Sequence, residues 1–111
     1  MKSHDKISRF DVYVVRLDPT TGHEVQKTRP AVVISPDEMN RRVQTVIIAP
    51  LTSTIRDYPT RITLRFQNRE GQIMLDQIRS VDRTRLVDFM GRVDAAAESK
   101  ILRCLAEMFA P

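Results

Sequence analysis

The segment DPTTGHEVQKTRP, residues 18–30, places an unusual set of reactive side chains between two apolar runs. They comprise two carboxylates, an imidazole, an ammonium and a guanidinium: Asp18, Glu24, His23, Lys27 and Arg29. Loops often carry function because a rigid scaffold positions their side chains. Arg29 suits a phosphate, because its planar guanidinium can donate two parallel hydrogen bonds to one anion. A solvated loop in which Arg29 merely precedes a proline is the alternative interpretation.

A second polar group follows the apolar run VQTVIIAPL, residues 43–51. Thr52 and Ser53 come directly after it, and their hydroxyls can donate to a phosphate or satisfy backbone groups in a turn. If the two strand ends meet at one rim of a sheet, Arg29 and Thr52 lie close together. The sequence therefore offers an anion site built from a guanidinium and a hydroxyl, with a purely structural turn as the alternative.

Several other kinds of site are not supported by the sequence. The chain has two histidines, His4 and His23, one cysteine, Cys104, and three glycines. It shows no Cys/His cluster at metal-ligand spacing and no glycine-rich phosphate loop, so we expect no metal site and no cofactor. Any catalysis is expected to use ordinary polar side chains.

Length and composition indicate one ordinary globular domain over residues 1–111, with 41% hydrophobic and 29% charged residues. A single cysteine favours a reducing compartment. The start MKSHDKISR lacks the apolar segment of a signal peptide, and no run approaches the ~20 apolar residues of a membrane span, so we expect a cytoplasmic protein without membrane contact. The net charge of +4 suits a polyanion or an acidic protein partner.

Apolar and β-branched runs predict short strands at residues 10–17, 31–35, 43–51 and 60–66. In the last of these, TRITLRF, apolar and polar residues alternate, which is typical of a half-buried strand. Residues 37–42 allow at most one helical turn. The residues NREG, 68–71, predict a hairpin turn that leads into a strand pair or one bent strand, followed by short strands around Gly91.

The C-terminal segment DAAAESKILRCLAEMFA has helical periodicity, with Asp94 as its expected N-cap. Its apolar residues at that spacing are Ala97, Ile101, Leu105 and Met108, joined by Leu102 and Phe109. The order of elements predicts a mainly β (α+β) fold: a small bent antiparallel sheet or barrel closed by one amphipathic helix.

Three segments resemble the MazF/PemK/Kid family of toxin endoribonucleases: LDPTTGHEVQKTRPAVVISP, APLTS and GQIMLDQIRSVD. The resemblance runs from about Phe10 to the C-terminal helix. It implies an SH3-like barrel of the PemK/CcdB type, a homodimer, and a metal-independent endoribonuclease. Such a toxin of a type II toxin–antitoxin system cleaves single-stranded mRNA by 2′-hydroxyl transesterification, which stops translation and growth. The implied partner is a MazE-like antitoxin with an acidic disordered segment. The toxin is then expected to contact DNA only indirectly, through this antitoxin.

In the MazF branch of this family, the resemblance places the catalytic pair at Arg29 and Thr52. The Kid branch instead uses an arginine two residues before an aspartate in an R-x-D-Q element. Here that element reads MLDQ, so Asp76 is present and Met74 occupies the arginine position. This departure favours the Arg29 and Thr52 scheme.

The remaining site residues implied by the resemblance are candidates for catalysis or RNA binding. His23, which matches a Kid-type loop histidine, Glu24 and Asp76 are candidates for either role. Recognition of splayed single-stranded bases is expected from further polar residues: Thr28, Ser53, Arg56, Gln77 and Arg79. Aromatic residues make up only 5% of the chain, so we expect hydrogen bonding to base edges to outweigh stacking.

Two alternative functions fit the same fold. A gyrase-poisoning toxin of the same superfamily would need a tryptophan near the C-terminus, and this chain has no tryptophan. A non-catalytic SH3-like module that binds nucleic acid or protein would have no need of both Arg29 and Thr52. The sequence therefore favours the endoribonuclease.

Overall fold

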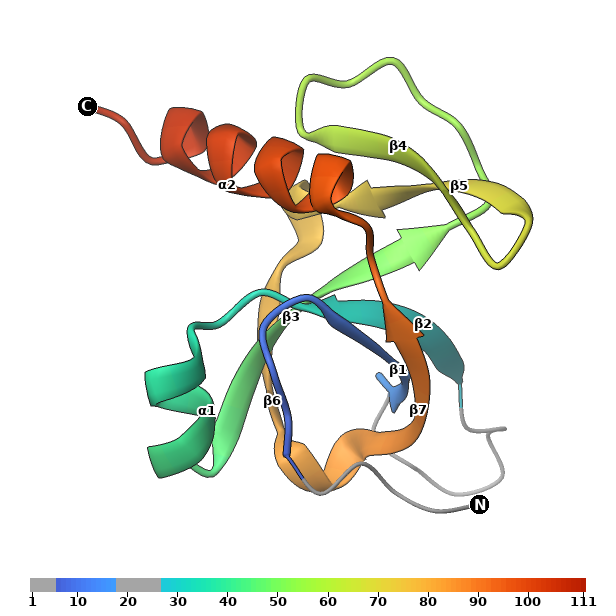
Figure 1. The fold of residues 1–111 in the computed structure, drawn as a ribbon. Helices are drawn as coiled ribbons and strands as arrows, with labels where there is room; N and C mark the ends of the chain where they lie inside the picture. Colours follow the sequence, from blue (N-terminus) through green and yellow to red (C-terminus); the bar gives the residue numbers. More distant parts are fainter. Residues whose placement is uncertain (1–5, 18–26) are drawn as a thin grey trace.

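The computed structural model describes residues 6–17 and 27–111, so His23 and Glu24 lie outside the described residues. The strands are β1 (Asp11–Arg16), β2 (Thr28–Val33), β3 (Thr45–Thr52), β4 (Arg61–Phe66), β5 (Arg69–Met74), β6 (Arg79–Asp82) and β7 (Leu86–Arg92). The helices are α1 (Asp37–Arg42) and α2 (Ala95–Met108), and two 3-10 turns are η1 (Leu75–Gln77) and η2 (Arg83–Arg85). Figure 1 shows α2 beside β4 and β5, with α1 at the far end of β3.

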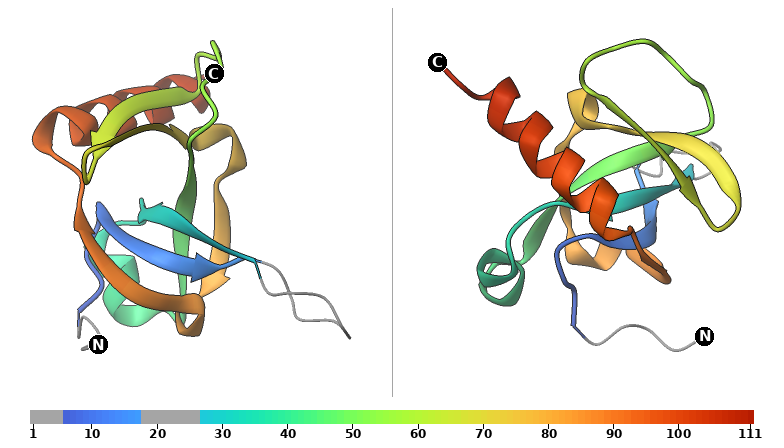
Figure 2. Two further views of the ribbon diagram at one scale, coloured as in Figure 1. Left: turned by 90° about the vertical axis from the view of Figure 1, so that its right-hand side faces the viewer. Right: turned by 45° about the horizontal axis from the view of Figure 1, so that its top comes forward.

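The strands form one curled antiparallel sheet in the order β4-β5-β3-β2-β1-β7, with β6 also paired to β3. Figure 2 shows how strongly this sheet curls on itself, with α2 lying across one end. The structure confirms the prediction of a mainly β fold with a bent antiparallel sheet and a C-terminal helix.

Strand β3 is the centre of the sheet, because it pairs with β2 along one edge and with both β5 and β6 along the other. Its first half pairs with β6, from Thr45–Asp82 to Ile48–Arg79, and its end pairs with β5, through Leu51–Ile73 and Thr52–Gln72. The 3-10 turn η1 lies between β5 and β6 and bends the chain there. Residues 72–82 thus follow β3 as one bent segment, as predicted.

Two buried clusters lie on opposite faces of the curled sheet, which explains why the first strands are apolar on both faces. In β1, Val12 belongs to the cluster under α2, whereas Tyr13 and Val15 belong to the second cluster. In β2, Val32 belongs to the cluster under α2 and Val33 belongs to the second cluster. An uninterrupted apolar run is what a strand needs when both of its faces are buried.

Helix α2 begins as predicted, because the Asp94 carboxylate accepts a hydrogen bond from the Ala97 amide at 2.9 Å. Ala97, Ile101 and Cys104 are its buried residues. The expectation that Leu102 and Phe109 join this face was wrong, since they are 41% and 69% exposed. Leu102 follows Ile101 by one residue, and a helix turns by about 100° per residue, so it points to the side.

The hairpin turn between β4 and β5 lies earlier than the sequence suggested. Gln67 and Asn68 form a two-residue turn with positive φ angles of 53° and 65°, and residues 69–71 already belong to β5. Left-handed angles at both positions are those of the tight turns that match strand twist, and asparagine tolerates them well. Gly71, which suggested the turn, serves another purpose.

Two other boundaries differ from the prediction. Strand β2 begins at Thr28 rather than at residue 31, so Arg29 lies on a strand and not in a loop. The two short strands expected around Gly91 are one strand, β7, which passes through Gly91 at a φ of 138° and shows register shifts against β1. Register shifts of this kind mark a bulge or another irregularity of the strand, which the sequence pattern alone does not distinguish from a break.

The N-cap of α2 gives a stability prediction. Replacing Asp94 by alanine removes the acceptor of the Ala97 amide, so the free energy of unfolding should fall by about 1 kcal/mol. Urea unfolding at one fixed protein concentration measures this. The control Asp88→Ala removes an exposed carboxylate of β7 and should leave the midpoint unchanged. Equal midpoints for the two variants would contradict the cap.

Candidate active site

Arg29 lies between two hollows on the rim of the sheet. The first, which we call the hairpin pocket, has a volume of about 420 Å³ and lies between Arg29, residues 52–54 and the β4–β5 hairpin. The second, the β6 hollow, has a volume of about 670 Å³ and is lined by Lys27, Thr28, Arg29, Gln77 and Arg79, among others. Most of the site residues expected from the sequence line one of these two hollows.

The register between β2 and β3 places Arg29 next to Thr52. These strands pair through Val33–Ile48, Val32–Ala49 and Ala31–Pro50. Arg29 and Thr52 each lie two residues beyond the Ala31–Pro50 pair, toward the same end of the two strands. The structure thus brings the two predicted catalytic residues together, and both line the hairpin pocket.

The guanidinium of Arg29 has no partner among the residues that the structure describes. Arg29 is exposed, and within the described part of the chain its side chain makes no hydrogen bond or ion pair. Its five N–H groups are therefore available to an incoming anion. A strand, rather than a loop, holds its backbone, because Arg29 pairs with Val15 of β1.

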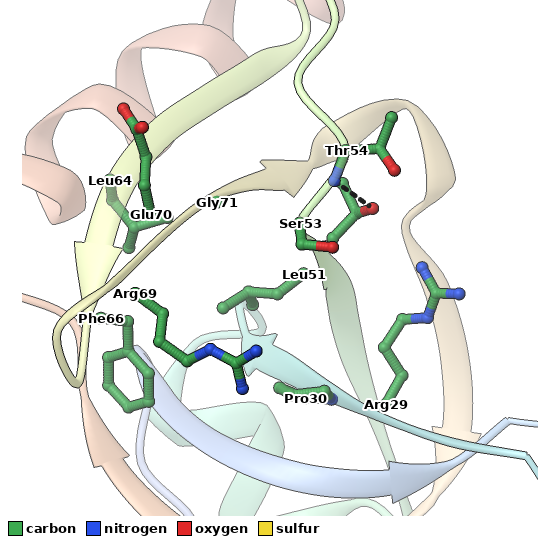
Figure 3. A pocket seen from close by; sticks show the side chains of 11 residues that line it. Arg29, Pro30, Leu51, Ser53, Thr54, Leu64, Phe66, Arg69, Glu70 and Gly71 are labelled. Carbon is green, nitrogen blue, oxygen red and sulfur yellow. Dashed lines mark hydrogen bonds between the residues drawn. The ribbon is translucent and has the colours of Figure 1, made fainter.

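Thr52 is held by one hydrogen bond that leaves its proton free. Its Oγ1 accepts the backbone N–H of Thr54 at 3.1 Å, which Figure 3 shows as a dashed line. A hydroxyl accepts through its lone pairs and donates through its single hydrogen. The contact therefore orients Thr52 while leaving it able to donate to a ligand oxygen. The turn interpretation from the sequence is confirmed, and because Thr52 also lines the pocket, its role as a donor to a ligand stays a prediction.

Gly71 lets β5 approach the backbone of Thr52. A Cβ atom at this position would lie 2.7 Å from the Thr52 carbonyl oxygen, closer than such atoms come in proteins. A glycine inside a strand often marks a close approach of two backbones. The glycine that suggested a turn is therefore a spacer beside Thr52.

Gln72 holds the loop that follows Thr52. Its side-chain Oε1 accepts the Arg56 amide at 3.0 Å, and its Nε2 donates to the Arg56 carbonyl at 3.0 Å and to Thr63 Oγ1 at 3.1 Å. Gln72 is only 3% exposed, so this contact ties residues 53–60 to β5 from within. Arg56 itself lines neither hollow, and the structure does not bring its side chain to Arg29.

Asp76 is engaged in a structural ion pair. Arg61 donates to its carboxylate from Nε at 2.8 Å and from Nη2 at 3.2 Å, and Thr60 donates at 3.0 Å. The hydrogen bond from Arg61 holds the pKa of Asp76 below its usual range, and the same contact raises the pKa of Arg61. Asp76 lines neither hollow. Its arginine partner comes from β4, where Arg61 pairs across the sheet with Met74.

Three residues beside the site were not singled out from the sequence: Arg69, Gly71 and Gln72. Arg69 and Gly71 line the hairpin pocket, and Gln72 supports it from inside. The positive charge of Arg69 in a hairpin was the one signal that could have suggested it. Within residues 6–17 and 27–111, no group of three or more His, Cys, Asp or Glu residues could hold a metal. No helix of this part of the chain is long and apolar enough to cross a membrane.

Comparison with known proteins identifies the class to which this curled antiparallel sheet closed by one helix belongs. A protein-family model, described as "PemK-like, MazF-like toxin of type II toxin-antitoxin system", matches residues 8–109 of this chain. The chain belongs to this family.

Individual relatives cover most of the chain. Endoribonuclease EndoA of Bacillus subtilis is 34% identical over 101 residues, which is 86% of this chain and 87% of that protein. A mycobacterial endoribonuclease solved in complex with its cognate antitoxin superposes with a TM-score of 0.80 at 27% identity, over 95% of this chain and 97% of that chain. A MazE–MazF structure from Deinococcus radiodurans superposes with a TM-score of 0.79 at 26% identity, over 92% of this chain and 94% of that chain.

The spacing between Gly71 and Thr52 gives a prediction about the geometry of the site. Gly71→Ala should displace the Thr52 carbonyl and lower the free energy of unfolding by ~1–3 kcal/mol, because overpacking forces the backbone to shift. A crystal structure and urea unfolding measure the two effects. Glu70→Ala is the matched control on the same strand and should change stability by less than ~0.5 kcal/mol. An undisplaced Thr52 in the alanine variant would contradict the spacer role.

Proposed function

We propose that this chain is the toxin of a type II toxin–antitoxin system and a sequence-specific endoribonuclease that cleaves single-stranded mRNA by 2′-hydroxyl transesterification. The observation that carries the proposal is that the Arg29 guanidinium and the Thr52 hydroxyl line one pocket. Among the described residues, the guanidinium has no partner, and the hydroxyl accepts a hydrogen bond but donates none. Family membership and the endoribonuclease names of its relatives support it.

The reaction makes three demands on the site. The 2′-oxygen attacks phosphorus as its proton leaves, the bond from phosphorus to the 5′-oxygen breaks, and the 5′-oxygen takes up a proton. The products are a 2′,3′-cyclic phosphate and a 5′-hydroxyl. Arg29 stabilises the charge of the phosphorane, and Thr52 donates to a non-bridging oxygen, since fixed donors aimed at developing charge contribute most to such catalysis. His23 and Glu24 are the candidates for the general base.

Binding of the RNA involves both hollows. Ser53 lines the hairpin pocket, and Thr28, Gln77 and Arg79 line the β6 hollow, so RNA that passes over Arg29 contacts residues on both sides. Their donors and acceptors suit the edges of unstacked bases. Asp76 contributes by holding the segment before Gln77 through its ion pair with Arg61.

The partners follow from the same proposal. The net charge of +4 suits both RNA and the acidic segment of a MazE-like antitoxin, and two related structures contain an antitoxin. We propose a homodimer that acts in the cytoplasm and reaches DNA only through its antitoxin.

The first experiment tests the reaction itself. Purified protein incubated in EDTA with a mixed RNA should produce fragments that carry 2′,3′-cyclic phosphate and 5′-hydroxyl ends, because the proposed reaction requires no metal. Replacing the ribose at a mapped cut site by 2′-deoxyribose should block cleavage and leave binding nearly unchanged, since only the nucleophile is lost. Cleavage of the deoxy-substituted oligonucleotide would rule out transesterification. Binding without any cleavage would favour the non-catalytic module instead.

The second experiment separates Arg29 from His23. Arg29→Ala should lower the turnover rate by roughly 10²–10³, whereas affinity should fall less because other basic residues also meet the backbone. Arg29→Lys should not restore the rate, because an ammonium lacks the bidentate fork. His23→Gln should act mainly on binding. If His23→Gln instead abolishes turnover and removes a limb near pH ~6.5 from the rate profile, then His23 is the general base and Arg29 only positions the RNA.

A further inference from the structure

The hairpin pocket contains a second guanidinium that the mechanism does not use. Arg69 is the first residue of β5 and follows the tight turn at Gln67 and Asn68, with its backbone paired to Phe66 of β4. A two-residue turn fixes the register of the strands that it joins, so the position of Arg69 on the hairpin is well defined. Figure 3 shows its side chain extending from the hairpin toward Pro30, while Arg29 stands on the other side of Pro30 with its guanidinium turned away from Arg69.

Neither guanidinium is neutralised by the part of the protein that the structure describes. Among the described residues, Arg69 makes no side-chain hydrogen bond or ion pair, as is also true of Arg29. The carboxylate that lines the pocket belongs to Glu70, and Figure 3 shows it pointing away from both guanidinium groups. Two positive charges on the walls of one pocket both attract an anion that enters it. Arg61, by contrast, is held internally by Asp76.

The other walls of the pocket indicate what kind of anion fits. Its apolar surface comes from Pro30, Leu51, Leu64 and Phe66, and its hydroxyls come from residues 52–54. A volume of about 420 Å³ lies within the ~300–1,000 Å³ typical of ligand pockets, which combine an apolar lining with a few polar groups. A nucleotide unit has this composition, since its base is largely apolar on its faces and its phosphate is charged.

We propose that Arg69 is a second phosphate-binding residue, and that it holds the phosphate next to the one that is cut. This inference rests on the proposed function and extends it by one subsite. Arg29 and Thr52 contact the reacting phosphate, whereas Arg69 contacts its neighbour within the hairpin pocket and positions the strand. A contact made equally in the ground state and the transition state changes KM and leaves kcat nearly unchanged. Arg69→Ala should therefore raise KM about tenfold.

The test pairs a protein change with a change in the RNA. Oligonucleotides that carry one methylphosphonate, which removes the charge of a single phosphate, are prepared for each position flanking a mapped cut site. Affinity is measured on the uncleavable 2′-deoxy form, and KM and kcat on the cleavable form. For wild type, one flanking methylphosphonate should weaken binding about tenfold. The same substitution should have no further effect on Arg69→Ala, because the contact is already lost.

Arg65→Ala is the matched control. Arg65 lies on the same hairpin and is exposed, donates from Nη2 to the Asn68 carbonyl at 3.2 Å, and does not line the pocket. Both variants lose one positive charge, so general attraction of RNA falls equally in the two. Arg65→Ala should keep the full response to the methylphosphonate.

The outcomes distinguish this inference from the proposed function. If wild type cleaves RNA but Arg69→Ala and Arg65→Ala respond alike to every methylphosphonate, the role of Arg69 is overturned and the endoribonuclease stands. A loss of kcat at unchanged KM in Arg69→Ala would also overturn it, since it would place Arg69 at the reacting phosphate. If wild type neither binds nor cleaves RNA, both proposals fall.

Discussion

The register between β2 and β3 is the constraint on which the site depends. Arg29 and Thr52 are far apart in the sequence, and they line one pocket because the pairing of Ala31 with Pro50 brings the neighbouring ends of the two strands to the same rim. Side chains alternate between the two faces of a strand, so a slip of one residue would turn one of the pair to the opposite face. Val32 is buried in one cluster and Val33 in the other, on opposite faces of the sheet. A slip of one residue would exchange these faces, so the packing of both clusters opposes it.

The rest of the sheet maintains the end of β3 in place. Strand β5 comes close to Thr52 because Gly71 has no side chain, and Gln72 on the same strand fixes the next loop through the backbone of Arg56. Buried polar side chains with all their partners satisfied give a structure one preferred arrangement. The position of the Thr52 hydroxyl thus depends on Gly71 and Gln72 of β5, two residues to which the proposed reaction gives no chemical role.

The sequence was informative where a local pattern determines the structure. The alternation of Ile62, Leu64 and Phe66 predicted β4, and the side chain of Asp94 predicted the start of α2. The residue types of Arg29 and Thr52 singled out two side chains that line one pocket, and their catalytic roles stay a prediction. Prediction failed where contacts between distant segments decide the outcome.

Gly71 is the clearest of these cases, since it was assigned to a turn although the Thr52 backbone across the sheet requires it. Asp76 is similar, because its partner Arg61 comes from β4, a strand whose pairing the sequence did not reveal. Arg69 enters the pocket only because the hairpin bends over the rim. No pattern of residue spacing in the sequence indicates that Arg69 lies in this pocket.

The position of Arg29 between the hairpin pocket and the β6 hollow has a consequence for turnover. A strand that occupies both hollows is a bivalent ligand, whose second contact forms at high effective concentration once the first is made. In the proposed reaction the strand is cut over Arg29, which would yield two fragments that each retain only one contact. Avidity is lost in the same step that breaks the bond, so the products dissociate more readily than the substrate without any movement of the protein.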